Sequence, residues 1–519
     1  MSEPTLSSLH GQRILVLGLG ESGLAMARWC ARQGAHVAVW DSRQSPPQLA
    51  ALREQVPLAE LRSGALDAVD SLHGVQWVLK SPGLGPNDPR IAPVLQAAHA
   101  AGVSVAGELE LFVQALAQLR AERDYAPQLL AVTGTNGKTT TTALTALLVE
   151  RAGRSVVAAG NISPTMLDTL MRVLDEDALP QVWVLELSSF QLDGVRDFQP
   201  NAAAVLNLTQ DHLDWHGDMA AYAAAKARIF GARTVAVINR DDPQVEAMLA
   251  PPAPGITAKG KVKAVKPVRR DVVRFGLHAP AAPGDYGLLT EGGIAWLVRA
   301  LPDEGEQRRR KDDQPTEIHL QRLMPADALR LRGRHNAANA LAALALATAI
   351  GCPLAPMLHG LREYGGEAHR VQPVGRVGDV EAFDDSKGTN VGATVAALVG
   401  LGDDRAPARL VVILGGDGKG QNFAPLAEPV ARHARAVALI GRDAAAIEQA
   451  LAGTGVPMQY HADLPCAVRW CFEQARAGDA VLLSPACASL DMFRNYGHRA
   501  EVFVQAVREW AAEHGEVLT

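Results

Sequence analysis

The sequence AVTGTNGKTT at residues 131–140 is the most informative stretch of this chain, because an apolar, strand-like segment runs directly into a glycine turn that opens a helix. This is the layout of a phosphate-binding loop. Gly134 and Gly137 allow backbone N–H groups to turn toward a polyphosphate. Lys138 adds a cation for the outer phosphates, and the hydroxyl of Thr139 can ligate Mg²⁺. The loop therefore predicts a protein that uses ATP.

The spacing of this loop departs from the usual nucleotide loop. The first glycine, expected five residues before Gly137, would fall on Val132. An ordinary Gly/Thr turn is the alternative interpretation, but Gly-Lys-Thr between an apolar strand and a helix has few purely structural reasons. The phosphate-binding interpretation is therefore favoured. The missing first glycine restricts the protein families to which such a loop can belong.

Length and composition limit the class of protein. A chain of 519 residues is long enough for about three domains. With 48% apolar and 20% charged residues and a net charge of −6, nothing favours binding to nucleic acid. The N-terminus does not resemble a signal peptide, and the longest apolar run, 337–350, is too short to span a bilayer. Five scattered cysteines without CxxC spacing argue against disulfides and zinc, so we expect a cytoplasmic protein without membrane insertion.

The N-terminal region reads as a βαβ unit with a dinucleotide-type fingerprint. The strand Arg13–Leu17 is followed by Gly18, Gly20 and Gly23, and the next strand, 36–40, ends at Asp41. An NAD-dependent dehydrogenase and a protein that binds a diphosphate nucleotide such as a UDP-sugar both satisfy this pattern. The fingerprint alone leaves the two open.

Two further sets of strands predict two further α/β domains with parallel sheets. The middle strands are expected at 129–132, 182–185, 203–206 and 235–238, and the last set at 410–414, 436–440 and 481–483. A polar linker is expected at 120–128, and a second boundary at Gly365-Gly366. We therefore predict three α/β domains: a Rossmann-like domain at 1–122, a central ATP-binding domain at 123–366, and a Rossmann-like domain at 367–519.

The stretch 251–322 lacks a clear pattern. It is rich in Pro, Gly and mixed charge, with a basic run at 259–270 and a polar run at 304–313. Because aromatic residues are sparse, surface insertions around a few short strands are favoured over a nucleic-acid patch. We assign this stretch no function.

Three further features of the central region carry chemistry. Glu186 follows the strand VWVL, and a carboxylate at a strand's C-terminal end suits Mg²⁺. The sequence DHLDWH at 211–216 places two imidazoles and two carboxylates after another strand, which favours a metal or phosphate site over structural histidines. Lys226 lies in a helical pattern whose spacing alone favours an exposed lysine.

Taken together, the motifs of this chain resemble those of the Mur ligases and occur in the same order. They are GTNGKT, ELSSFQL at 186–192, DHLDWH, YAAAK ending at 226, GRHN at 333–336, HR at 369–370, DDSKGTN at 384–390, GGDGKG at 415–420 and SPACASLD at 484–491. The phosphate loop and DHLDxH specify the superfamily, which includes folylpolyglutamate synthase. ELSSFQL, SPACASLD and DSK-x-TN are similar to the branch that adds D-glutamate to UDP-N-acetylmuramoyl-L-alanine in peptidoglycan precursor synthesis.

The resemblance implies an ATP-dependent amide ligase that works through an acyl phosphate and acts as a monomer. The residues implied to be catalytic are Lys138, His212 and Lys226. Those implied to bind ATP are Gly134, Thr135, Asn136, Gly137, Lys138, Thr139, Thr140, Asn336, Arg370 and Asp385. Those implied at the Mg²⁺ site are Thr139, Glu186, His212 and Lys226, of which Lys226 matches a lysine that family members carbamylate.

The resemblance also implies where the other substrates bind. The UDP-substrate residues are Gly20, Ser22, Asp41, Ser42 and Asn161. The amino-acid residues are Lys387, Thr389, Lys419, Ser489 and Tyr496, the last at a position where a phenylalanine can stand in relatives. With the nucleotide between the middle and last domains, we expect catalysis to require domain closure about a hinge near Gly365-Gly366.

Other functions stay open at this point. An NAD-dependent oxidoreductase and a noncatalytic nucleotide-switch ATPase explain parts of the pattern, but neither explains SPACASLD or DDSKGTN. Within the ligases, an enzyme that adds L-glutamate or L-lysine is the nearest rival, because the sequence does not reveal the stereochemistry of the added amino acid.

Overall fold

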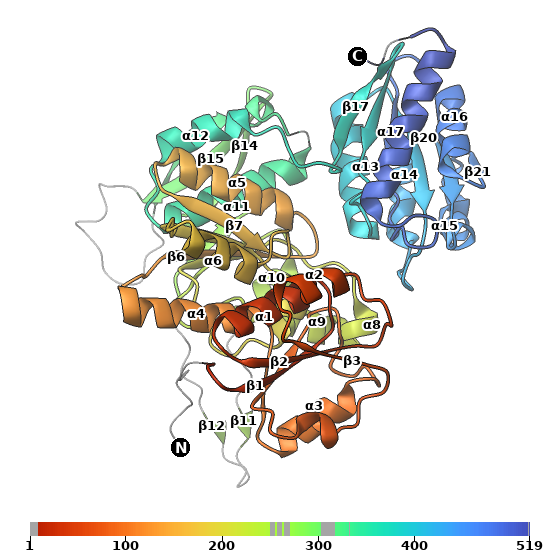
Figure 1. Cartoon of the computed structure of the whole chain (residues 1–519). Helices are drawn as coiled ribbons and strands as arrows, with labels where there is room; N and C mark the ends of the chain where they lie inside the picture. The colour runs from red at the N-terminus through yellow and green to blue at the C-terminus, as the bar shows by residue number, and fades with distance from the viewer. Residues whose placement is uncertain are drawn as a thin grey trace.

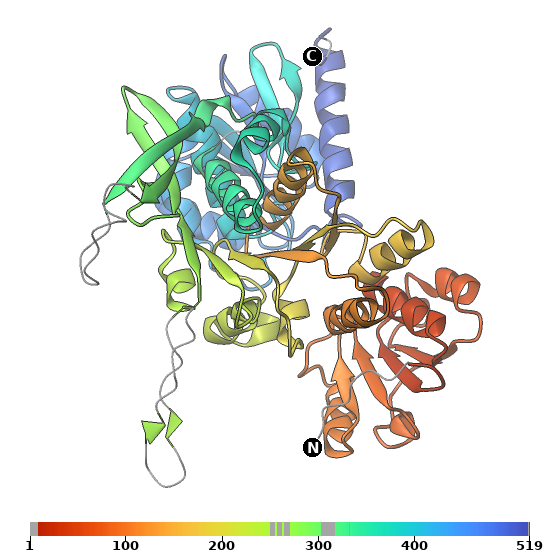
Figure 2. The same ribbon diagram turned by 90° about the vertical axis from the view of Figure 1, so that its left-hand side faces the viewer.

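The computed structural model describes residues 9–249, 255–256, 262–263, 270–302, 317–331, 333–516 and 518. Three α/β domains follow one another along the chain, as the sequence predicts. Figures 1 and 2 show the N-terminal domain (red to orange) and the C-terminal domain (blue) on different sides of the central domain. No helix of these ranges is both long and apolar enough to cross a membrane.

The N-terminal domain is a parallel five-stranded sheet in the order β3-β2-β1-β4-β5, with helices on both faces. Its elements are β1 (Arg13–Leu17), α1 (Glu21–Arg32), β2 (His36–Asp41), α2 (Leu49–Gln55), β3 (Glu60–Ser63), the 3₁₀ turn η1 (Asp70–Leu72), β4 (Trp77–Lys80), α3 (Ala92–Ala100), β5 (Ser104–Ala106) and α4 (Glu108–Arg123). Gly23 lets α1 approach the turn after β1, because a Cβ there would lie 1.9 Å from the carbonyl oxygen of Gly18.

The central domain contains a parallel six-stranded sheet in the order β13-β10-β9-β6-β8-β7. Its elements are β6 (Gln128–Thr133), α5 (Lys138–Arg151), β7 (Val156–Gly160), α6 (Met166–Asp175), β8 (Val182–Glu186), α7 (Ser189–Asp193), β9 (Ala202–Val205), α8 (Leu213–His216), α9 (Met219–Ala227), β10 (Val235–Asn239), α10 (Pro243–Ala247), β13 (Val272–Phe275), α11 (Arg334–Ala349) and α12 (Leu354–Glu363). Helix α11, the longest apolar run of the sequence, is buried as expected.

The stretch 251–322 is more ordered than its sequence pattern indicates where the structure describes it. After the short pair β11 (Gly255–Ile256) and β12 (Val262–Lys263) come β13 of the main sheet and an antiparallel sheet made of β14 (Tyr286–Glu291), β15 (Ile294–Pro302) and β16 (Ile318–Pro325), which leads into the turn η2 (Ala326–Ala328). The hydroxyl of buried Tyr286 bonds Thr348 of α11, 3.0 Å away, so this sheet is anchored to the core. Most of the basic run 259–270 and all of the polar run 304–313 lie outside the described residues.

The C-terminal domain has a six-stranded sheet in the order β17-β18-β22-β19-β20-β21, parallel except for the edge strand β17. Its elements are β17 (Gln372–Val377), β18 (Val380–Asp384), α13 (Val391–Arg405), β19 (Leu410–Gly415), η3 (Ala424–Leu426), α14 (Ala427–His433), β20 (Ala434–Ile440), α15 (Ala444–Leu451), η4 (Ala452–Thr454), β21 (Met458–Tyr460), α16 (Leu464–Gln474), β22 (Ala480–Leu483) and α17 (Tyr496–Glu513).

One apolar core joins the N-terminal and central domains, whereas the C-terminal domain has cores of its own. Phe112 of α4 packs edge-on against Trp183 of β8, with ring centroids 4.9 Å apart. Helix α4 continues through Arg123, so the expected linker at 120–128 is shorter than predicted. The reason is that the polar residues 120–123 complete the last turn of a helix whose other face is buried.

Candidate functional site

The loop between β6 and α5 has the geometry of a phosphate-binding turn. Gly137 precedes the first helical residue with φ +84°, and a Cβ there would lie 2.6 Å from Asn339 Oδ1, so no other residue fits without a shift. The amide of Asn136 donates to Asn207 Oδ1 at 2.8 Å. Thr135 Oγ1 lies 3.1 Å from the hydroxyl of Tyr222. The segment after β9 and the helix α9 thus hold the loop in place.

Lys138 folds back over this loop. Its Nζ donates to the carbonyl oxygens of Gly134 and Thr135 at 3.0 and 2.8 Å. Burial lowers the pKa of Lys138, while the carboxylates of Glu186 and Asp211 oppose that shift. The ammonium therefore lies at the centre of the loop, where outer phosphates bind in such turns.

Glu186 ends β8 and is almost completely buried, with 2% of its surface exposed. Its Oε1 accepts a hydrogen bond from Asn161 Nδ2 at 2.8 Å, whereas its Oε2 has no hydrogen-bond partner. A buried carboxylate oxygen without a partner is costly, so this oxygen is available for a cation.

His212 lies before α8 in a left-handed conformation, with φ +54°. Its Nε2 is 3.4 Å from Asp211 Oδ2, and its ring packs edge-on against Phe190 of ELSSFQL, centroids 4.7 Å apart. Burial lowers the pKa of His212, Asp211 opposes this shift, and the lysines at 419, 138 and 226 reinforce it. A neutral imidazole is the form that can ligate a metal.

Lys226 is buried, with 1% of its surface exposed, so the exposed helix lysine favoured by spacing alone is excluded. Its Nζ donates to Gly134 O at 2.9 Å and to Thr133 Oγ1 at 3.3 Å. Burial lowers the pKa of Lys226 well below its usual value, and nearby Lys138 lowers it further. Lys226 and Lys138 therefore both donate to the carbonyl oxygen of Gly134.

Residues of the C-terminal domain reach the phosphate loop from the other side. Arg370 Nη2 and Lys387 Nζ both donate to Thr139 Oγ1, at 3.0 and 3.4 Å. The side-chain amides of Asn136 and Asn390 exchange two hydrogen bonds of 3.2 and 3.0 Å. The structure thus brings together the loop and the HR and DDSKGTN motifs, more than 230 residues away.

A small cavity of about 60 Å³ lies between the central and C-terminal domains beside this loop. The expected ATP residues that line it are Asn136, Gly137, Thr140, Asn336, Arg370 and Asp385. Burial raises the pKa of Asp385 to about 7, and a hydrogen bond from Ser484 opposes that shift. Asn339 and His335 also line the cavity and were not predicted, although both lie in or next to the GRHN motif.

The five expected amino-acid residues all belong to loops at one end of the C-terminal sheet or to the start of α17. Lys387 Nζ lies 5.7 Å from the ring centroid of Tyr496. The GGDGKG loop, with Lys419, pairs with the SPACASLD loop, with Ser489, through backbone hydrogen bonds between Asp417 and Ala488. Thr389 is half-buried two residues after Lys387.

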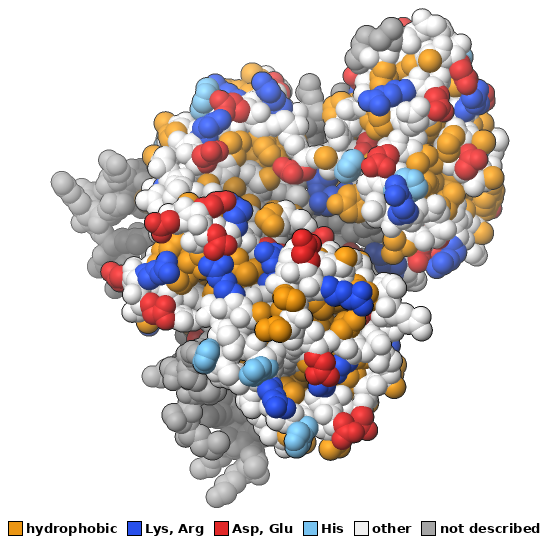
Figure 3. Space-filling view, in the orientation of Figure 1, with side chains coloured by type: hydrophobic (Ala, Val, Ile, Leu, Met, Phe, Trp, Pro, Cys, Tyr) orange, Lys and Arg blue, Asp and Glu red, His pale blue; other side chains and the backbone are white. Residues whose placement is uncertain are grey.

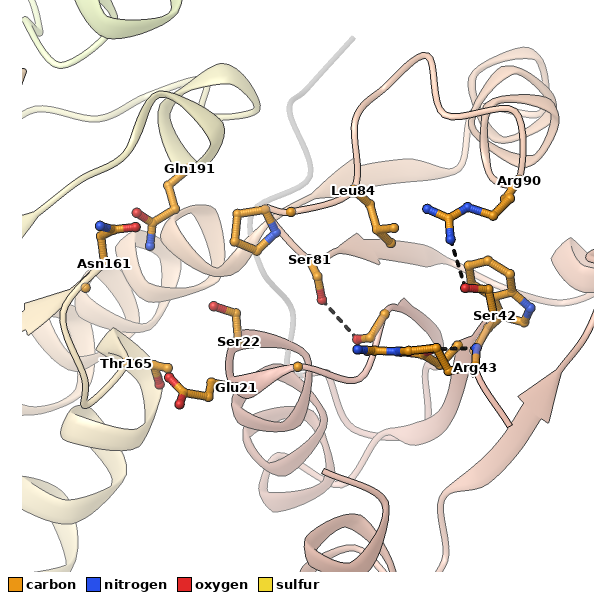
Figure 4. Close-up of a pocket in the computed structure, with 17 residues that line it drawn as sticks. Glu21, Ser22, Ser42, Arg43, Ser81, Leu84, Arg90, Asn161, Thr165 and Gln191 are labelled. Atoms are coloured by element: carbon orange, nitrogen blue, oxygen red, sulfur yellow. Dashed lines mark hydrogen bonds and ion pairs between the residues drawn. The ribbon is translucent and has the colours of Figure 1, made fainter. Parts of the chain in front are cut away.

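A second, larger cavity of about 570 Å³ lies between the N-terminal and central domains (Figure 4). Its lining includes all five expected UDP-substrate residues: Gly20, Ser22, Asp41, Ser42 and Asn161. It also includes polar residues that the sequence did not single out: Glu21, Arg43, Ser81, Arg90, Thr165 and Gln191. Asn161 and Thr165 come from the central domain, so both domains build this cavity.

Asp41 is already engaged in this cavity. Its carboxylate accepts two hydrogen bonds of 2.8 Å from the guanidinium of Arg43 and one of 2.8 Å from the Leu19 amide. Burial works to raise the pKa of Asp41, but these hydrogen bonds outweigh it and lower the pKa to about 2. Asp41 therefore holds the glycine turn and Arg43. The guanidiniums of Arg43 and Arg90 both line the cavity, paired with Asp41 and Asp88 respectively.

Among the residues that the structure describes, no group of three or more His, Cys, Asp or Glu side chains gathers into a metal cage. All five cysteines are free, and only Cys466 is exposed. Figure 3 shows positive and negative side chains interspersed over the face that it displays, without a large area of one sign.

Three family models match successive parts of the chain. They are the MurD-like N-terminal domain of Mur ligases at residues 12–107, the Mur ligase middle domain at 132–275, and the glutamate ligase domain of Mur ligases at 369–487. The matched ranges follow the three sheets.

Curated relatives match nearly the whole chain. A UDP-N-acetylmuramoylalanine–D-glutamate ligase of Albidiferax ferrireducens is 60% identical over 511 residues, 98% of each chain. The protein of the same name from Burkholderia pseudomallei is 59% identical over 513 residues, 97% of this chain and 98% of that one.

Solved structures of lower identity share the fold. A MurF ligase of Thermotoga maritima in complex with ADP has a TM-score of 0.56 at 15% identity, covering 98% of this chain and 100% of that one. The UDP-N-acetylmuramate-alanine ligase MurC of the same organism has a TM-score of 0.54 at 21% identity, covering 96% and 99%.

Proposed function

Because this chain belongs to the Mur ligase family, we propose that it is the ligase that joins D-glutamate to UDP-N-acetylmuramoyl-L-alanine at the expense of ATP. The observation that carries the proposal is the position of Asn161. It lines the large cavity and donates to Glu186, which pairs in register with Val132 just before the phosphate loop. A long nucleotide substrate held in the cavity would therefore extend its other end toward the γ-phosphate of ATP.

We propose that the uridine diphosphate occupies the N-terminal cavity. Gly20 and Ser22 stand at the start of α1, where backbone amides and the helix dipole favour a diphosphate. The guanidiniums of Arg43 and Arg90, now paired with Asp41 and Asp88, would offer hydrogen-bond donors to the diphosphate. Ser42, which also lines the cavity, accepts a hydrogen bond of 3.0 Å from Arg90 Nη1. Membership of the Mur ligase family favours a substrate nucleotide over a nicotinamide cofactor here.

ATP is assigned to the phosphate loop, at residues 134–140, and to the neighbouring small cavity with Asn336, Arg370 and Asp385. The loop amides and Lys138 would hold the phosphates, and Arg370 approaches from the C-terminal domain. We propose that the contact of Arg370 with Thr139 gives way to a contact with the phosphates when ATP binds, and that Lys387 leaves Thr139 to bind the incoming amino acid.

The residues present fit a Mg²⁺ site. Glu186 Oε2 is buried without a hydrogen-bond partner. The hydroxyl oxygen of Thr139 and an imidazole nitrogen of His212 offer further metal-ligating atoms beside the loop. Mg²⁺ is commonly held by one or two protein groups together with phosphates and water, which agrees with the lack of a larger carboxylate cluster among the described residues. When bound, Mg²⁺ would neutralise charge on the transferring phosphoryl group.

Lys226 also fits carbamylation. A neutral amine is the form that reacts with CO₂, and burial lowers the pKa of Lys226 well below its usual value. In that reaction the nitrogen forms a bond to carbon and loses a proton, which leaves a carbamate anion. The anion would relieve the repulsion between Lys226 and Lys138 and provide an oxygen ligand for a cation.

The chemistry follows from this arrangement. The carboxylate of the L-alanyl group attacks the γ-phosphorus, the bond to the ADP oxygen breaks, and an acyl phosphate forms. Lys138 and Arg370 offset the charge that develops on the phosphoryl oxygens. The neutral amine of D-glutamate then attacks the acyl carbon, the bond to phosphate breaks, and the nitrogen loses a proton. His212 lies beside Asp211 at the same edge of the sheet and is proposed as a further catalytic group.

The incoming amino acid is assigned to the C-terminal loops. Lys387 and Lys419 would bind its two carboxylates, with Thr389 and Ser489 as hydroxyl donors. Tyr496, whose side chain is 40% exposed, would close one side. This site faces the phosphate loop because Lys387 already contacts Thr139.

We further propose that the domain boundaries lie near residues 122 and 366. The second boundary lies between α12 and β17, and we propose that the hinge for closure is at Gly365-Gly366. Because every proposed contact comes from one chain, a monomer is sufficient for the reaction. We propose that the protein acts in the cytoplasm, which the use of ATP and of a nucleotide substrate supports. Size-exclusion chromatography with light scattering tests the monomer.

The function is tested by ADP release from the purified protein with ATP, Mg²⁺ and UDP-N-acetylmuramoyl-L-alanine, in the presence of D-glutamate, L-glutamate or no amino acid. Turnover with D-glutamate alone is expected. Turnover with L-glutamate would change the substrate but keep the chemistry. ADP release without the nucleotide substrate would overturn the proposal in favour of an ATPase, and a change in nicotinamide absorbance would support an oxidoreductase.

A further inference from the structure

Arg499 is a fully buried arginine that none of the assignments above uses. It lies on α17, close to one helical turn after Tyr496, with 0% of its surface exposed. Helix α17 packs against α16 in the C-terminal domain (Figure 1). The two residues that the side chain of Arg499 bonds, Ser386 and Cys487, belong to the same domain.

Its guanidinium bonds backbone oxygens instead of carboxylates. Nη1 donates to the carbonyl oxygen of Cys487 at 3.1 Å and Nη2 to that of Ser386 at 2.8 Å, while Nε has no hydrogen-bond partner. Within the described part of the chain, Arg499 forms no ion pair of 4.0 Å or less. Burial lowers its pKa to about 10, against the opposing effect of Cys487 and nearby acidic groups, so it stays charged at neutral pH.

Keeping an unpaired cation in the core is costly, and core packing alone would be served as well by an apolar side chain of similar length. What an apolar side chain cannot supply is the pair of donors. The planar guanidinium has its donors in a rigid fork, so it fixes the distance between the two oxygens that it bonds.

These two oxygens belong to two different loops of the proposed amino-acid site. Ser386 follows β18 and directly precedes Lys387, and Cys487 follows β22, two residues before Ser489. Strands β18 and β22 are parallel neighbours, so their following loops emerge side by side. Beyond Arg499, the described contacts between the two loops include the 2.6 Å hydrogen bond from Ser484 to Asp385.

We propose that Arg499 is a positioning residue for the amino-acid substrate: its guanidinium bonds the loops of Lys387 and Ser489 at once and holds them at the separation that a dicarboxylic amino acid requires. This inference rests on the proposed function. It extends it to a residue that does not touch substrate, cofactor or reacting atoms.

The test compares Arg499→Met, which keeps the length and removes the donors, with Arg499→Lys, which keeps the charge and loses the fork. Arg508→Met is the matched control, because Arg508 is exposed on the same helix. The measurements are KM for D-glutamate, KM for ATP and for UDP-N-acetylmuramoyl-L-alanine, the thermal midpoint, and acyl phosphate formed without amino acid and trapped with hydroxylamine.

Arg499→Met is expected to raise KM for D-glutamate by about tenfold or more, the effect of losing charge-assisted hydrogen bonds. Its KM values for ATP and the nucleotide substrate and its trapped acyl phosphate should stay within about twofold of the wild type, as for Arg508→Met. The KM of Arg499→Lys for D-glutamate should lie between those of the wild type and Arg499→Met, because an ammonium restores the charge and part of the hydrogen bonding.

An unchanged KM for D-glutamate, or an equal loss in all three KM values and in trapped acyl phosphate, would overturn the inference. If Arg499→Met does not fold, Arg499→Lys decides by the same two criteria. Failure of the wild type to use D-glutamate would instead overturn the proposed function, so the two failures are distinguishable.

Discussion

Arg370 donates from Nη2 to Thr139 Oγ1 over 3.0 Å, although 231 residues separate them in the chain. Arg370 precedes the first strand of the C-terminal domain, and Thr139 lies in the first turn of α5. The contact therefore brings the guanidinium of Arg370, from the C-terminal domain, to the phosphate loop. The Nε of Arg370 is buried without a hydrogen-bond partner.

Arg370→Met should lower kcat by about 10- to 100-fold, because a charge directed at the transferring phosphoryl group is lost. Steady-state ADP release over a range of ATP concentrations measures it. Arg376→Met, on exposed Arg376 of β17, is the control and should stay within about twofold. Equal effects of the two substitutions would contradict a role in phosphate binding.

Glu186→Gln should raise the Mg²⁺ concentration for half-maximal activity by about tenfold or more, because an amide is a poorer ligand than a carboxylate. The substitution keeps an oxygen that can accept from Asn161, so the local hydrogen bond survives. A Mg²⁺ titration of the rate measures it, with Glu150→Gln, on exposed Glu150 of α5, as the control. An unchanged Mg²⁺ requirement would place the cation elsewhere.

Carbamylated Lys226 should give a carbamate carbon signal in ¹³C NMR spectra recorded with labelled bicarbonate. The signal is expected because burial lowers the pKa of Lys226 well below its usual value, which favours the neutral amine that reacts with CO₂. Lys226→Arg should lack the signal and lose activity, since a guanidinium stays charged. A signal that persists in Lys226→Arg would arise from another amine, and no signal in the wild type would refute the modification.

Glu108 at the start of α4 links the N-terminal and central domains. Its Oε1 accepts from the amide of Leu167 in α6 at 3.0 Å, and burial raises its pKa from 4.5 to about 7, against hydrogen bonds with Leu167, Ser22 and Thr165. Between these values the native state binds more protons than the unfolded state, so folding stability attributable to this group falls as pH rises from about 4.5 to 7.

Glu108→Gln removes this titration. The stability of the wild type relative to the variant should therefore decrease from pH 4.5 to 7, by on the order of 3 kcal/mol at most. Urea unfolding at several pH values measures the difference. A relative stability that does not change with pH, or one that increases, would contradict the raised pKa.

Much of the fold could be predicted from the sequence. The strand Arg13–Leu17 has the predicted bounds, and most other predicted strands differ by one or two residues, because buried parallel strands are continuous apolar runs. The antiparallel sheet β14–β16 was not predicted as a sheet from the sequence. Its strands are partly exposed, and long-range pairing rather than local pattern defines them.

The residues of the candidate site also fall into two groups: those that the local sequence indicates and those that only the structure reveals. The phosphate loop, Glu186 and DHLDWH could be proposed from the sequence because each lies at the end of a predicted strand, and strand ends of a parallel sheet meet at one edge. Arg43 and Arg90 were missed, since an arginine in a loop gives no periodic signal. Only the structure shows that Arg43 and Arg90 line the cavity to which we assign the nucleotide substrate.

The sequence by itself determined the three α/β domains, the phosphate loop and the family, because these depend on local apolar runs, glycine turns and the order of motifs. Only the tertiary structure decided that Lys226 is buried beside Lys138, that Asp41 is engaged by Arg43, and that Arg499 joins two loops. Burial and contacts between residues far apart in the chain set a side chain's charge and partners, and neither is encoded in local spacing.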